Sequence, residues 1–204
     1  MVSAYPVQFN VDFPEKKLDR LSTAFRIIVA IPIVVVLTML SGQTFQDDDS
    51  RNSLVIGGAA VFVPLVLMLV FRQKYPRWWF DWNLNLMRFS NRVTAYLALL
   101  DDRYPSTDEE QSVHLDFAYP DAGQMNRWLP LVKWLLAIPH YFVLVFLGIA
   151  ALGAIIAAWF AILFTGTYPR ALFTFVVGVL RWSNRVTAYA FTLVTDQYPP
   201  FSLS

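Results

Sequence analysis

An internal duplication is the feature that most limits how this chain can fold. The heptapeptide SNRVTAY occurs at Ser90–Tyr96 and again at Ser183–Tyr189. Each copy lies in a longer matched segment, at 74–106 and 167–200. Similarity at a fixed spacing indicates that one structural unit occurs more than once.

The matched segments extend upstream in the same order. RIIVAIP at Arg26–Pro32 matches KWLLAIP at Lys133–Pro139, and VDFPE at Val11–Glu15 resembles LDFAYPD further along the chain. The first half carries an insert, SGQTFQDDDSRNS, between its two apolar segments. We therefore predict two tandem repeats, over residues 1–106 and 107–204.

The composition indicates a lipid environment. Of the 204 residues, 56% are hydrophobic and 15% are charged, whereas soluble domains have about 45–50% apolar and about 25% charged residues. The net charge of +1 gives no reason to expect a nucleic-acid partner, and without cysteine the chain has neither disulfides nor thiolate chemistry. We expect an integral membrane protein.

Each unit opens with a short stretch in which apolar and polar residues alternate. Val7, Phe9 and Val11 alternate with polar residues, and the same pattern recurs around Val113 and Leu115. A period of two residues is typical of a β-strand. We predict one short strand before each apolar region, and the two strands could pair with each other.

Two apolar spans follow in each unit, at about 24–40 and 54–71 and at about 129–147 and 148–164. A membrane-spanning helix needs about 20 residues, with about 17 as the lower limit. We predict a transmembrane helical hairpin in each unit. The second pair has almost no polar turn, so a re-entrant hairpin is the alternative, and one long helix is not expected.

An amphipathic helix ends each unit, at about 76–100 and 169–195. Lys and Arg flank the spans, whereas the first interspan loop carries Asp47, Asp48 and Asp49. The positive-inside rule then places both termini and both amphipathic helices in the cytoplasm. The predicted fold is an all-α integral membrane protein of two parallel repeats, each a hairpin plus a cytoplasmic-face amphipathic helix, with short β-strands before each hairpin.

The amphipathic helices carry the candidate site. Arg and Asn residues recur there at three- and four-residue steps, which places them on one helical face. The hypothesis is a lipid-headgroup or anion site formed by Arg77, Arg88, Asn91, Arg92, Arg170, Arg181, Asn184 and Arg185. The competing interpretation is that these Arg side chains are general interfacial anchors and cap acidic groups such as Asp101, Asp102 and Asp196.

No arrangement in the sequence indicates catalysis. There is no nucleophile elbow, phosphate-binding glycine loop or acid/base carboxylate pair. His114 and His140 are isolated from other residues at metal-ligand spacing, so each is best interpreted as a packed polar side chain. We expect no enzyme activity, no metal and no cofactor.

The last segment resembles a known family. WFAILFTGTYPRALFTFVVGVLRWSNRVTAYAFTLVTDQYPPFSL at 159–203 is similar to the signature of domain of unknown function 4389. VFRQKYPRWWFDWNLNLMRFSNRVTAYLALLDDRYPS in the first half is similar but has FRQK where the second half has FTGT. The resemblance implies a small bacterial inner-membrane module in one or two copies. It implies no activity and no catalytic residues.

The expected function is that of a non-enzymatic accessory or scaffold subunit of a bacterial inner-membrane assembly. The alternative is a lipid-binding or lipid-transport component that uses the paired Arg residues. The expected partners are anionic membrane lipids and other membrane proteins, with no nucleic acid. The expected location is the bacterial inner (cytoplasmic) membrane, as a multi-pass protein.

Overall fold

The computed structural model describes residues 5–15, 17–40, 65–107 and 109–204. Within them the chain is mostly helical with one small sheet. In chain order the elements are β1 (Val7–Val11), α1 (Arg20–Leu40), the π-helical turn η1 (Met68–Arg72), α3 (Arg77–Leu97), β2 (Val113–Phe117), α4 (Leu129–Leu136), α5 (Ile138–Thr165) and α6 (Arg170–Ala190).

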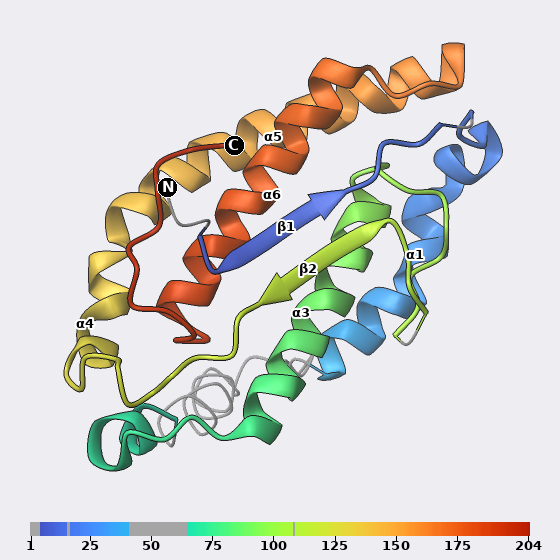
Figure 1. The fold of residues 1–204 in the computed structure, drawn as a ribbon. Helices are drawn as coiled ribbons and strands as arrows, with labels where there is room; N and C mark the ends of the chain where they lie inside the picture. The colour runs from blue at the N-terminus through green and yellow to red at the C-terminus, as the bar shows by residue number, and fades with distance from the viewer. Residues whose placement is uncertain (1–4, 16, 41–64, 108) are drawn as a thin grey trace, which may run out of the picture.

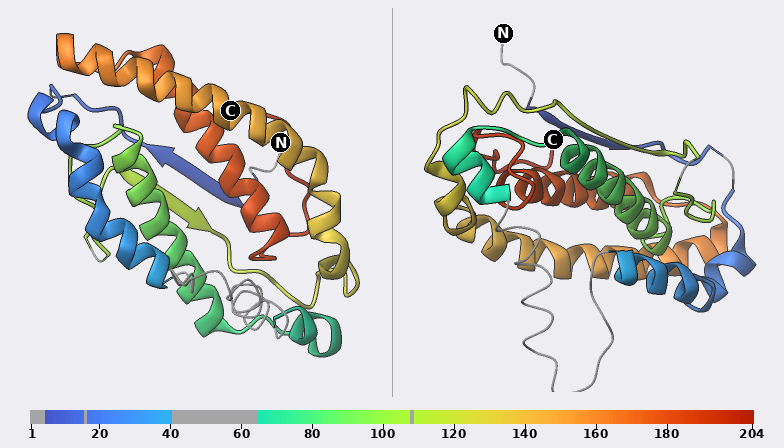
Figure 2. Two further views of the ribbon diagram at one scale, coloured as in Figure 1. Left: turned by 180° about the vertical axis from the view of Figure 1, so that it is seen from behind. Right: turned by 90° about the horizontal axis from the view of Figure 1, so that it is seen from below.

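The elements stack in three layers (Figures 1 and 2). The β1–β2 ribbon forms one outer layer, α3 and α6 form the middle layer, and α1 with α4 and α5 forms the other outer layer. Seen edge-on, the helices of the outer layer run along the plane of the sheet. The candidate site lies on α3 and α6, in the middle layer.

The predicted strands form and pair with each other. β1 and β2 are antiparallel, with Phe9 opposite Leu115 at the centre of the ladder. Alternate residues of both strands are buried, and these apolar side chains belong to the main hydrophobic core with residues of α3 and α6. The period of two therefore predicted both strands, and their apolar residues form the buried face.

The first predicted span forms a helix. α1 covers 20–40 and continues through Pro32. Most of its apolar side chains are exposed. Residues 41–64 lie outside the described part of the chain, so most of the predicted span at 54–71 does too. Its described end, from Leu65, is helical and finishes in η1.

The predicted reversal at 147–148 is wrong. α5 is one continuous helix over 138–165, and the helical run is interrupted earlier, at Ala137 between α4 and α5. Pro139 occupies the first turn of α5, where its missing N–H costs nothing. Gly148 and Gly153 lie inside the helix. A single glycine costs only about 1 kcal/mol there, so the helix continues through both positions.

The two amphipathic helices form as α3 and α6, at 77–97 and 170–190. Each ends just before a leucine with positive φ, Leu99 at 65° and Leu193 at 57°. The sheet covers the face of these helices that carries Arg88 and Arg181, and α1 and α5 lie against the other side.

Candidate functional site

The centre of the candidate site is a pair of asparagines. Asn91 of α3 and Asn184 of α6 each donate from Nδ2 to the side-chain oxygen of the other, at 2.8 and 2.7 Å. The same nitrogens donate to the carbonyls one turn earlier, those of Met87 and Leu180. Both asparagines are buried, and this reciprocal bond joins the two helices.

The arginine one turn before each asparagine binds the sheet. Nε of Arg88 donates to the carbonyl of Leu115 at 2.9 Å, and Nε of Arg181 donates to the carbonyl of Phe9 at 2.9 Å. These two carbonyls belong to the residues that face each other in the ladder. Arg88 also forms an ion pair with Asp116 at 2.9 Å.

On α6 the remaining donors bind the end of the chain. Nη1 of Arg181 donates to the carbonyl of Leu203 at 3.0 Å, and Nη1 of Arg185 donates to that of Ser202 at 3.5 Å. The guanidinium of Arg185 lies 5.8 Å from the Tyr5 ring. Burial, followed by the nearby positive charge of Arg181, lowers the pKa of Arg185 from its usual value. Because Arg181 and Arg185 already donate to these carbonyls, an additional anion would compete with contacts inside the protein.

On α3 the corresponding region is more open. Nη1 of Arg92 donates to the carbonyl of Ser106 at 2.8 Å. A groove of about 900 Å³ lies between α3, the two strands and the loop before β2. Arg88, Arg92, Asn85 and Gln111 line it together with the acidic side chains of Glu110 and Asp116. The groove is polar but carries both signs of charge.

The first arginine of each helix lies away from this centre. The guanidinium of Arg77 lies over the Tyr119 ring at 5.4 Å, and that of Arg170 lies over the Phe13 ring at 4.9 Å. Because α3 and α6 run in opposite directions, their starts lie at opposite ends of the molecule (Figure 1). The structure thus brings together six of the eight predicted residues, while Arg77 and Arg170 make separate cation–π contacts.

Two buried cations were not predicted as site residues. Arg26 of α1 is 2% exposed, and its guanidinium donates to the carbonyls of Tyr96 and Asp101 at 2.9 Å each. It also forms an ion pair with the carboxylate of Asp102. Arg26 therefore anchors α1 to the end of α3.

Lys133 of α4 makes the equivalent contacts with the segment after α6. It is fully buried, and Nζ donates to the carbonyl of Thr195 and pairs with Asp196, both at 2.7 Å. Nζ also lies 5.4 Å from the Tyr189 ring. The signal was present in the sequence, because Arg26 and Lys133 both begin the matched RIIVAIP and KWLLAIP segments. The predicted capping of Asp102 and Asp196 does occur, but by these cations.

The histidines lie apart. His140 is buried at the start of α5, where it accepts a hydrogen bond from Nε1 of Trp182 at 3.1 Å and stacks on Phe201. His114 is exposed on β2 and contacts Asp12 at 2.9 Å. Within the described residues no three His, Asp or Glu side chains come together as a possible metal site.

Comparison with known proteins gives one match. The family model described as Domain of unknown function (DUF4389) matches residues 128–202, from the start of α4 to the chain end beyond α6. One copy is found, and the first half of the chain is outside the match. No curated protein and no solved structure matches the chain. The match over 128–202 supports the assignment of this segment to the DUF4389 family.

Proposed function

We propose that the chain is a non-enzymatic accessory module of a bacterial inner membrane, which presents an apolar helical face to lipid and to neighbouring membrane proteins. The observation that carries the proposal is the exposure of α1 and of the helical run at 129–165. Both are long and apolar enough to cross a membrane, and only 17% of the most apolar stretch of each is buried.

A soluble role fits this surface poorly. The core helix of a soluble protein can be equally apolar, but its side chains are covered. Here Phe25, Ile27, Phe142, Ile149 and Phe164 are each more than half exposed. Large contiguous apolar patches on a protein surface mark a membrane or protein interface.

The proposal includes two copies of one unit. The duplicated sequence is supported by contacts that recur in pairs: the Arg88 and Arg181 bonds to facing strand residues, and the buried cations of α1 and α4. In the sequence, the insert in the first half falls between its two apolar segments.

A second candidate function is the binding of an anionic lipid headgroup at the groove beside Arg88 and Arg92. The groove of about 900 Å³ favours it, because two guanidinium groups line one polar space. Against it, Arg88 already pairs with Asp116, and Arg181 and Arg185 bind the carbonyls of the protein itself. The accessory role is therefore the stronger proposal.

Native mass spectrometry after purification of the full chain in mild detergent distinguishes the two candidates. The accessory role predicts stoichiometric protein partners that persist in the Arg88→Gln variant. The lipid role predicts one retained class of anionic lipid, lost in Arg88→Gln and kept in the exposed control Arg103→Gln. A chain that carries neither a protein partner nor a lipid would contradict both candidates.

A further inference from the structure

The exposed apolar side chains of α1 and α5 gather on one side of the molecule, which we call the outer face. It includes Phe142, Ile149, Ile156 and Phe164 of α5 and Ile27 and Met39 of α1, all more than half exposed. The opposite side of α5 carries Ala151, Ala154 and Ala158, which are buried in the core shared with α6. The α5 helix therefore has one side against protein and one side without a partner among the described residues.

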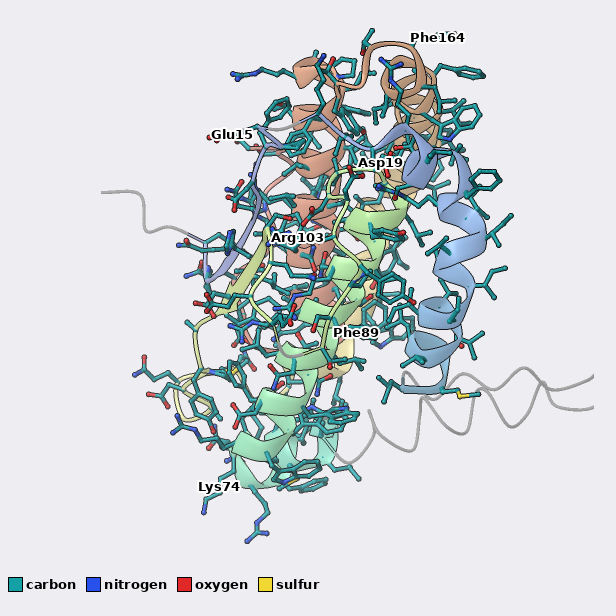
Figure 3. All side chains as sticks on the ribbon, turned by 90° about the vertical axis from the view of Figure 1, so that its right-hand side faces the viewer. Glu15, Asp19, Lys74, Phe89, Arg103 and Phe164 are labelled. Carbon is teal, nitrogen blue, oxygen red and sulfur yellow. The ribbon has the colours of Figure 1, made fainter. Side chains whose placement is uncertain are left out.

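The helices that carry the outer face lie parallel to the plane of the sheet. In the edge-on views, α1 and α5 lie in one layer on one side of α3 and α6, and the ribbon of β1 and β2 lies on the other (Figures 2 and 3). The two helices meet where α1 begins and α5 ends, at Arg20 and Phe164, and diverge from there (Figure 1). Phe164 lies on the α1–α5 side in Figure 3, and Glu15 lies on the sheet side. If α5 crossed a bilayer along its axis, the sheet beside it would have to enter the hydrocarbon as well.

The sheet is unsuited to that environment. The outward residues of the strands are polar, among them Gln8, Asn10, His114 and Asp116. The side chain of Asp116 is 79% exposed and that of His114 is 58% exposed. Among the described residues the ribbon has two strands, so each strand has one edge that pairs with no other strand. Open sheet edges are not found in contact with lipid tails.

We infer that α1 and α5 lie in the plane of the membrane interface, with the outer face in the acyl region and the sheet in water. The inference rests on the proposed membrane association and specifies its geometry. A helix with an apolar side in this position is buried about 5–10 Å into the boundary between headgroups and acyl chains. The occupant of the outer face is therefore a lipid leaflet.

The rim of the outer face fits a lipid leaflet better than a second protein. Arg20 lies at one end, where it donates to the carbonyl of Phe164, and Arg127 lies at the other, just before α4. Trp128 and Trp134 are also exposed at that end, 65% and 51%. Tryptophan and basic residues at the border of an apolar surface are typical of headgroup contact.

The test is a depth measurement on the full chain in vesicles of phosphatidylcholine and phosphatidylglycerol. The chain has no cysteine, so single spin labels are introduced without background at F142C, I149C, I156C and F164C. Q8C on the sheet is the matched water-facing control. Collisions with oxygen and with a water-soluble nickel chelate report how deeply each label lies. The 22 steps from Phe142 to Phe164 cover about 33 Å at about 1.5 Å per residue, enough to separate the two geometries.

In the in-plane arrangement all four α5 labels show similar depth, and the control label collides freely with nickel. A profile that is deepest at Ile149 and Ile156 and shallow at both ends would overturn the inference and leave membrane association standing. Free nickel access at all five positions would overturn the inference and the proposed function together.

Discussion

The side-chain amides of Asn91 and Asn184 donate to each other at 2.8 and 2.7 Å, and this reciprocal bond joins α3 to α6 at the centre of the middle layer. Replacing either asparagine by alanine leaves a buried amide without one partner, which costs about 1–3 kcal/mol. We expect N91A and N184A each to lower the free energy of unfolding by that amount. Thermal unfolding in detergent, followed by circular dichroism, measures the change.

The double variant gives the sharper result. If the two amides act as a pair, N91A/N184A costs less than the sum of the single variants, with a coupling of about 0.5–3 kcal/mol. Asn85→Ala is the control, because Asn85 is an exposed asparagine of the same helix. Additive losses would contradict the pairing.

The buried ion pair between Lys133 and Asp196 predicts a strong charge requirement. In K133M the carboxylate, which is 26% exposed, loses its cation, and breaking a buried pair costs about 3–5 kcal/mol. We expect K133R to retain most of the stability, since Arg26 makes the equivalent contacts with Asp102. Chemical unfolding of the three proteins compares them, and Arg103→Met, at an exposed ion pair, serves as the control. Equal stability of K133M and wild type would show that the pair does not hold α4.

Gly178 lies where the end of the chain packs closely against α6. A Cβ at this position would lie 2.9 Å from both the Cβ and the backbone oxygen of Leu203. Overpacking of this kind costs about 1–3 kcal/mol, so G178A should destabilise the protein and raise amide hydrogen exchange around Leu203.

Gly153 is the matched control for that experiment. A Cβ there meets nothing within 4 Å, and alanine is favoured over glycine in a helix by about 1 kcal/mol. G153A should therefore be neutral or stabilising. A G178A protein as stable as G153A, with unchanged exchange at Leu203, would contradict the packing of the C-terminal segment.

Tyr75 and Tyr168 predict different responses to the same substitution. The hydroxyl of Tyr75 donates to the carbonyl of Thr192, whereas that of Tyr168 is buried without a partner among the described residues. We expect Y75F to cost about 1 kcal/mol at neutral pH and Y168F to cost nothing. Urea unfolding at pH 7 measures both, and equal losses would contradict the assigned contacts.

The same tyrosines predict loss of stability in alkali. Burial raises the pKa of Tyr75 and of Tyr168 above the usual value of 10.0. The unfolded chain therefore releases these protons at lower pH than the folded one, so the stability they contribute is complete below about pH 10 and falls as the pH rises beyond it. Unfolding measured from pH 8 to 11 should fall less steeply in Y168F than in wild type. The same slope in both would show that Tyr168 does not contribute.

The repeated segments of the sequence predicted the local elements well. The alternation around Phe9 and Leu115 predicted two strands that could pair, and the three- and four-residue spacing of the arginines predicted α3 and α6. These signals are local, because the pattern is set by the periodicity of one element. The long apolar run did not reveal its conformation. Its composition suits a hairpin or a single helix, and a continuous α5 forms because the run has no polar turn.

The roles of the arginines could not be predicted from their spacing. Helical periodicity places Arg88 and Arg181 on one face, but it does not say that strands from elsewhere in the chain cover that face. The buried cations Arg26 and Lys133 were hidden for a related reason, since a charge beside an apolar segment indicates a membrane flank unless its partner is known. Their partners lie 76 and 63 residues further along the same unit, at Asp102 and Asp196.

Vesicle flotation most directly tests the claim that the outer face of α1 and α5 binds a membrane. The full chain, transferred from detergent to vesicles containing phosphatidylglycerol, should float with the lipid and resist carbonate extraction. Replacing Phe142, Ile149 and Phe164 together by serine should release it, whereas the matched leucine triple variant should still float. A wild-type chain that remains in solution without detergent and does not float, or a serine variant that floats like the leucine variant, would contradict the account.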